Sequence, residues 1–159
     1  MTIESLAQDL QAAQQEVVAS LAGASERELH TAPGDGEWTA SEVAAHVIEM
    51  QAMWMEKIAK ADCEPDLARS HSEIERRTAS VEAHSGDDLE TVTRRLAESC
   101  GRTMELLQGM SSSDLDRPVT YGHGAASGIA IEAARSLVVS HLSEHAQQIT
   151  ETRQAVGDG

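Results

Sequence analysis

Two histidines lie four residues apart near the end of the chain, in the segment His141-Leu-Ser-Glu-His145. On an α-helix this spacing puts both imidazoles on one face, about 6 Å apart along the axis. A helical wheel places the pair in the middle of an apolar arc that includes Leu137, Val138 and Ile149. We therefore expect both rings to point into the interior of the protein.

Imidazoles in such a position need partners. A buried polar group without a hydrogen bond costs about 1–3 kcal/mol, and protonating either ring would place a charge in the core. One divalent cation would satisfy both rings. The alternative is a pair of core histidines that hydrogen-bond to Ser, Thr or Glu side chains of other helices, and the pattern by itself leaves both interpretations open.

A second helical segment offers a third ligand. His46 lies between Val43 and Met50, about 70° from the centre of the apolar stripe on an ideal wheel, so its ring can face inward. Three neutral histidines around an open fourth position form a known catalytic zinc arrangement. The same imidazoles would also accept nickel, iron or copper. The hypothesis is a metal site made of His46, His141 and His145.

The same segment also fits H-x-x-E-H, the inverted zinc-peptidase signature in which the glutamate is the base. We reject this interpretation because Glu144 lies about 100° from His145 on the wheel, toward the polar face. Such enzymes also take an acidic ligand from far downstream, whereas only fourteen residues follow His145.

Three further residues are candidates for supporting roles. His123, between two glycines, is a candidate for a fourth ligand that would close the site. Glu42 and Glu49 lie one turn on either side of His46 and could orient its ring as outer partners. A solvated helix face is the favoured interpretation of both glutamates.

The elements that must position these residues are helices. Apolar residues recur at spacings of three and four in four long segments, and no stretch shows the alternation of a half-buried strand. Thr39 and Glu42 begin the second segment as a T-x-x-E capping box. We predict an all-α, up-down four-helix bundle with a long crossover loop, as a single domain over residues 1–159. Its helices are expected from Ile3 to about Gly23, from Thr39 through Ile58, from Asp87 or Asp88 to about Gly109, and from about Ser127 to Ala155.

Two connections have weaker patterns. Residues 63–86 contain few apolar positions among many charges, which predicts a loop and a short, poorly anchored helix. Residues 111–127 are rich in serine and glycine. Cys63 and Cys100 have no metal-ligand spacing, so we expect two reduced thiols.

Charge excludes several classes of partner. Twenty-seven acidic residues against twelve basic ones give a net charge of −15, which repels nucleic acid. The longest apolar runs are far shorter than the ~20 residues of a membrane span, and the amino terminus lacks the pattern of a secretory signal. A cytoplasmic protein with no membrane segment is expected.

Two motifs resemble those of the DinB/YfiT-like superfamily of metal-dependent enzymes: Gly36-Glu-Trp-Thr-Ala-Ser-Glu-Val-Ala-Ala-His46-Val and His141-Leu-Ser-Glu-His145-Ala-Gln-Gln-Ile149. The resemblance covers nearly the whole chain. It implies a four-helix bundle that holds a metal, usually zinc or nickel, on three histidines. By position these are His46, His141 and His145, the same three that the wheel selects.

The resemblance also implies a chemistry. Relatives include transferases and isomerases that use a low-molecular-weight thiol such as mycothiol or bacillithiol. In that chemistry the metal binds the sulfur and stabilises the thiolate, which indicates a metal-dependent thiol S-transferase acting on a small molecule. One such subfamily has a glutamate in its metal set, whereas this chain has histidine at all three positions.

Two other functions stay open at this point. One is a non-catalytic stress-response or ligand-binding bundle with a structural metal, and the other is a metal-dependent hydrolase with a bound water as nucleophile. A homodimer is also expected, because bundles often bury a spare apolar face against a second copy.

Overall fold

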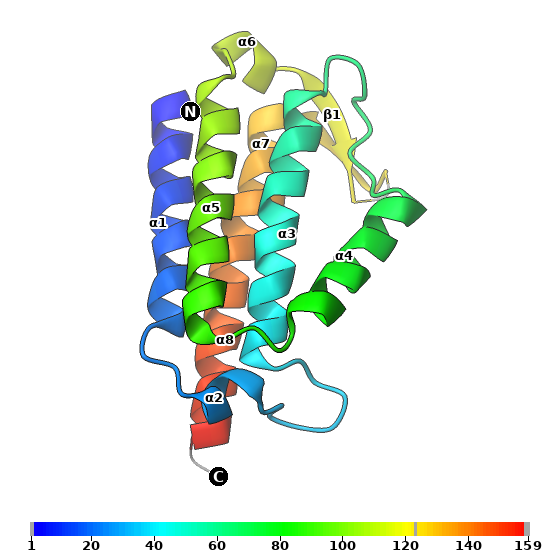
Figure 1. The fold of residues 1–159 in the computed structure, drawn as a ribbon. Coiled ribbons are helices and arrows are strands. Elements are labelled where there is room, and N and C mark those ends of the chain that lie inside the picture. The colour runs from blue at the N-terminus through cyan, green and yellow to red at the C-terminus, as the bar shows by residue number, and fades with distance from the viewer. Residues whose placement is uncertain (1, 123, 158–159) are drawn as a thin grey trace.

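The computed structural model describes residues 2–122 and 124–157, and four long helices form its frame (Figure 1). These helices are α1 (Ile3–Leu21), α3 (Ala40–Ala59), α5 (Leu89–Gln108) and α8 (Ser140–Gly157). Helix α8 continues α7 (Ala130–Ala134) through a π-helical turn, η1 (Arg135–Val139). The predicted helical class and four-helix bundle are confirmed.

Local signals begin and end these helices as the sequence indicates. The Thr39 hydroxyl accepts the Glu42 amide at 3.2 Å, and the Glu42 carboxylate accepts the Thr39 amide at 2.8 Å, so α3 begins in a complete capping box. The Asp88 carboxylate accepts the Thr91 amide and begins α5. Gly23 follows α1 with a φ of +69°, a conformation that glycine adopts without strain.

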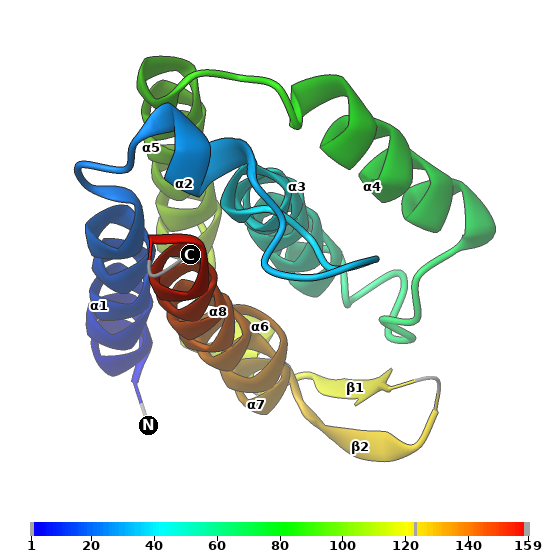
Figure 2. The same ribbon diagram turned by 90° about the horizontal axis from the view of Figure 1, so that it is seen from below.

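Helices that follow one another in the sequence are not all neighbours in the bundle. Helix α1 packs against α5 and α8, and α3 packs against the same two from the opposite corner (Figure 2). Helices α3 and α5 run in the same direction, because α4 (His71–His84) returns the chain along the outside of α3 (Figure 1). This is the expected long crossover. Since α3 and α8 are antiparallel neighbours, side chains from the middle of each can meet.

The core is aliphatic because the chain contains no phenylalanine. Leucine, methionine and isoleucine fill the space between the four helices, and their burial is the main favourable term of the fold. The largest side chains with almost no solvent exposure include Leu6, Leu10, Met50, Ile58, Leu96, Leu107 and Ile149.

Short elements outside the bundle were not predicted. They are α2 (Glu26–His30), α6 (Ser112–Leu115) and an antiparallel hairpin of β1 (Pro118–Tyr121) and β2 (Ala126–Ile129). The expectation of a chain without strands is wrong for β1 and β2. The last helix begins at Ala130 rather than near Ser127. Strands of four residues are too short for an alternating pattern to be recognised.

The hairpin holds the loop that leads into α4. The Leu67 amide donates to the Thr120 carbonyl at 2.8 Å, and the Thr120 amide donates to the Pro65 carbonyl at 3.0 Å. Leu67 itself is fully buried. The start of the crossover is therefore fixed against β1.

Helix α4 is the least anchored of the longer helices. Val81 is the one buried side chain in the described residues 71–84, whereas fourteen of the twenty residues of α3 are buried. Two ion pairs connect α4 to α3, Lys57 with Glu73 at 3.0 Å and Arg76 with Glu49 at 2.7 Å. Such half-exposed pairs contribute little to stability.

Among the described helices, none combines the length and the apolar character that crossing a bilayer requires.

We expect α4 to open locally while the bundle stays folded, because it buries so little apolar surface. In native-state hydrogen exchange, amides of residues 75–84 should exchange on the order of a hundredfold faster than those in the middle of α3. Mass spectrometry of peptic fragments measures both regions in one sample. Equal protection of the two helices would contradict this prediction.

Candidate metal centre

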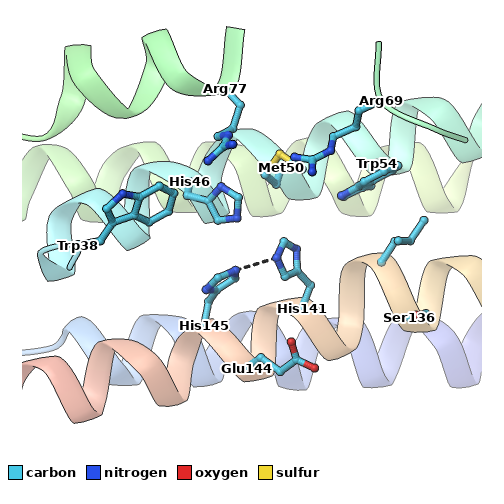
Figure 3. A pocket seen from close by; sticks show the side chains of 11 residues that line it. Trp38, His46, Met50, Trp54, Arg69, Arg77, Ser136, His141, Glu144 and His145 are labelled. Atoms are coloured by element: carbon cyan, nitrogen blue, oxygen red, sulfur yellow. Dashed lines mark hydrogen bonds between the residues drawn. The ribbon is translucent and has the colours of Figure 1, made fainter. Parts of the chain in front are cut away.

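Three histidines meet between α3 and α8 (Figure 3). The ring centre of His46, from α3, lies 5.3 Å from that of His141 and 4.8 Å from that of His145, both from α8. The two rings of α8 lie 4.3 Å apart. One nitrogen from each ring can be chosen so that all three lie within 4.8 Å of one another. The structure thus brings together the three residues that the sequence selects.

A π-helical turn comes just before this cluster. Residues 135–139 form η1, and His141 follows it by two positions. A π turn contains more residues than an α turn, so it changes which residues downstream face the partner helix. Nothing in the apolar pattern of the sequence indicates this turn.

Hydrogen bonds set the orientation of His145. Its Nδ1 lies 2.7 Å from the Gln148 side-chain oxygen, which can only accept, so Nδ1 carries the proton. The Nε2 of His145 is then an acceptor and lies 2.7 Å from the Nε2 of His141. Gln148 therefore acts as the outer partner that turns a lone pair of His145 toward the other two rings.

His46 is not satisfied by the protein. The ring is 7% exposed, and its Nδ1 is buried without a hydrogen-bond partner. Such a nitrogen costs about 1–3 kcal/mol. In the described part of the chain, no Ser, Thr or Glu side chain of another helix bonds to any of the three rings. The alternative in which Ser, Thr or Glu side chains of other helices satisfy the histidine pair is therefore not what the structure contains. His141 and His145 bond to each other, His46 keeps a buried Nδ1 without a partner, and the donor set suits a cation.

Burial keeps two of the rings neutral. Loss of solvent is the largest cause that lowers the pKa of His46 to about 3, with smaller contributions from His145, His141 and two arginines. Burial followed by the charge of His145 lowers the pKa of His141 to about 4. At neutral pH both rings carry a free lone pair, which is the form that binds a metal.

A cavity of about 450 Å³ adjoins the three rings, which is the size of a small-molecule site. Trp38 packs edge-on against His46 at 5.2 Å between ring centres, and Trp54 lines the cavity farther along α3. Arg69 and Arg77 line the same cavity. Sequence reasoning missed both arginines, because residues 63–86 contain no motif that relates them to the histidines.

The other residues singled out in the sequence take different places. Glu42 belongs to the capping box of α3, and Glu49 accepts from Arg76 at 2.7 Å, so the favoured surface interpretation holds for both. Glu144 is exposed, and its carboxylate does not point toward the three rings (Figure 3). His123, the candidate fourth ligand, lies outside the described residues.

The metal-free protein should lose stability as the pH falls below about 6.5. The pKa of His46 is lowered from 6.5 to about 3 in the folded protein. Between pH 6.5 and pH 3 the unfolded chain therefore binds more protons than the folded protein, so lowering the pH favours unfolding. His46 should contribute about 2 kcal/mol of this loss between pH 7.5 and pH 5. Chemical denaturation of the wild type and of His46→Gln at both pH values measures it. The expected pH dependence is smaller in the variant, and equal slopes would contradict the assignment.

Comparison with solved structures shows the same fold in two other proteins. One is YfiT from Bacillus subtilis, described as a probable metal-dependent hydrolase with an unusual four-helix bundle topology. It matches with a TM-score of 0.75 and 20% identity over 98% of this chain and 87% of that one. The other is a mycothiol-dependent maleylpyruvate isomerase, with a TM-score of 0.72 and 15% identity over 94% of this chain. This chain spans 61% of the length of that isomerase.

At these identities the likeness concerns the fold, and no curated protein matches the chain in sequence. Family membership comes from a separate comparison. The model of the DinB superfamily matches residues 9–149, which is most of the chain. The protein therefore belongs to the DinB superfamily.

Proposed function

We propose that His46, His141 and His145 together hold one divalent metal ion, zinc or nickel. Three observations support this proposal: the convergence of the rings, the lowered pKa values of His46 and His141, and the buried Nδ1 without a partner. Imidazole nitrogens suit both metals. The likeness to YfiT, described as a probable metal-dependent hydrolase, agrees with it.

We further propose that the protein is a metal-dependent thiol S-transferase that uses a low-molecular-weight thiol such as mycothiol or bacillithiol. The observation that carries this proposal is the cavity of about 450 Å³ beside the three rings, which is large enough for a small molecule that brings a sulfur donor to them. A bound metal would lower the pKa of the thiol and stabilise the thiolate. The likeness to a mycothiol-dependent isomerase supports the choice of thiol.

The reaction forms a bond between the sulfur and an electrophilic carbon. The bond from that carbon to its leaving group breaks, and the thiol proton goes to the leaving group through solvent. The chain itself orients the components: Gln148 fixes the ring of His145, and burial keeps His46 and His141 unprotonated. Trp38 and Trp54 provide apolar walls for the molecules that enter the cavity.

A metal-dependent hydrolase is the second candidate, because the likeness to YfiT favours it. In that case water would take the place of the thiol in the same cavity. A purely structural metal is the least supported alternative. A structural site is usually closed by a fourth ligand, and in the described residues the cluster of His, Cys, Asp and Glu side chains contains these three members.

The partner we propose is a small molecule, in agreement with the cavity volume of about 450 Å³. Binding of nucleic acid is not expected of a chain with a net charge of −15. A homodimer and a cytoplasmic location stay predictions from the sequence.

The ligand assignment predicts that His145→Ala lowers the metal content sharply, because two imidazoles remain where three held the ion. We expect about one metal per chain in the wild type and a loss of affinity of at least about a hundredfold in the variant. Elemental analysis after dialysis measures the stoichiometry. The matched control is His71→Ala, which removes an exposed histidine that pairs with Glu75. Unchanged stoichiometry in His145→Ala would refute the assignment.

The proposed activity predicts metal-dependent conjugation. Zinc-loaded and nickel-loaded protein should accelerate the reaction of mycothiol or bacillithiol with a chloro-dinitrobenzene electrophile, and chelation should remove the acceleration. Absorbance of the thioether product measures the rate. Ester hydrolysis by the same samples without thiol would favour the hydrolase instead. If neither reaction turns over in any metal form, the enzymatic proposal fails.

A further inference from the structure

Two arginines face the three histidines across the cavity. Arg69 lies just before α4, and Arg77 lies in the middle of α4. Figure 3 shows both side chains reaching from the α4 side toward α3, where His46, Trp38 and Trp54 are exposed to the cavity. The guanidinium carbon of Arg69 is 5.9 Å from the Trp54 ring centre. The corresponding distance from Arg77 to the Trp38 ring centre is 5.7 Å.

Neither guanidinium has an acidic partner in the described part of the chain. Arg76, the neighbour of Arg77, is paired with Glu49 at 2.7 Å, and ion pairs also engage Arg95, Arg102, Arg117, Arg135 and Arg153. Arg69 and Arg77 form no such pair, although acidic residues outnumber basic ones by more than two to one. The Nε of Arg77 is buried and has no hydrogen-bond acceptor. A buried charged donor without an acceptor is unfavourable, so this position is suited to receive one.

The tryptophans hold these guanidinium groups in place without neutralising them. A guanidinium over an aromatic face is stabilised by the ring, while its N–H groups, which lie in the guanidinium plane, stay free to donate hydrogen bonds. A carboxylate partner would instead use those N–H groups. The pairing of each arginine with a tryptophan therefore leaves two charged donors ready for a ligand from outside the chain.

The charge of the cavity is opposite to that of the protein. The net charge of the chain is −15, which repels small anions at long range. Inside the cavity, His46 and His141 are neutral, two guanidinium groups are positive, and the carboxylate of Glu144 points away from the rings. Walls of low polarity concentrate such a local field.

We propose that Arg69 and Arg77 bind an anionic oxygen group, a carboxylate or a phosphate, of the small molecule that enters the cavity. The planar fork of arginine donates two parallel hydrogen bonds to either group. With its anionic end held on the α4 side, the ligand presents its other end to the three imidazoles. This last point rests on the proposed function, whereas the binding of the anion does not.

The fold gives this subsite a specific support. Backbone bonds to β1 fix residues 65–67 just before Arg69, and two ion pairs connect α4, which carries Arg77, to α3. Arg69 thus follows a fixed segment, whereas Arg77 lies on a weakly anchored helix. Opening of α4 would release Arg77 and give a ligand access to the cavity.

The test titrates the full chain with malonate and with inorganic phosphate at constant ionic strength. Both tryptophans of the protein lie under these arginines, so tryptophan fluorescence reports binding directly, and calorimetry gives the stoichiometry. Arg69→Gln and Arg77→Gln should each weaken binding by about tenfold or more, the usual loss for a charged hydrogen-bond donor. Arg102→Gln is the matched control, since it removes the same charge from an exposed site on α5 that does not line the cavity, and its affinity should stay within about twofold of the wild type.

The two probes separate the sources of the anion: tighter binding of malonate assigns a carboxylate, and tighter binding of phosphate assigns a phosphate. Binding of neither probe, or an equal loss in Arg102→Gln, would overturn the inference. Titrating metal-free and metal-loaded samples of known metal content distinguishes this result from the proposed function. Arginine-dependent binding in a protein that takes up no metal supports the subsite and refutes the metal centre. Binding that requires the metal and is unchanged in both arginine variants supports the metal centre and refutes the subsite.

Discussion

Removal of the His46 imidazole from water, and partial removal of those of His141 and His145, is the constraint on which the rest of the structure depends. The three rings meet between α3 and α8, where the protein leaves the buried Nδ1 of His46 without a hydrogen-bond partner. Desolvation keeps His46 and His141 unprotonated, which costs stability in the isolated chain and prepares the rings for a cation. The aliphatic core of the four helices must offset that cost. The site is therefore a local loss of stability that the surrounding packing tolerates.

The two sides of the cavity differ in how firmly they are held. The histidine side belongs to α3 and α8, which are buried in the bundle, so its geometry is rigid. The arginine side belongs to the crossover, where α4 contributes one buried residue and a few ion pairs. Elements of low local stability are those that move when ligands bind. A fixed histidine side that faces a movable arginine side suits the proposed enzyme, which must admit and release a substrate.

Charge separates the inside of the cavity from the outside of the protein. An acidic surface suppresses nonspecific binding of polyanions, whereas two arginines over tryptophans attract a small anion once it has entered. The tryptophans serve both sides of the cavity, since Trp38 contacts the ring of His46 and also lies under Arg77. The three histidines, the aromatic walls and the cationic groups thus form one connected site rather than separate features.

The sequence by itself determined the long helices and the helix faces that carry the three histidines. The positions of the long helices follow from apolar spacing and from caps at Thr39, Asp88 and Gly23. A helical wheel is enough to predict that His46, His141 and His145 face another helix. These are local properties, because each depends on residues within a few turns of the same helix. Tertiary structure alone decided the placement of Arg69 and Arg77 over the tryptophans and the pairing of residues 65–67 with β1. Both depend on how the crossover packs on the rest of the chain. Contacts between segments distant in sequence leave no periodic signal in either segment, so only the folded chain reveals them.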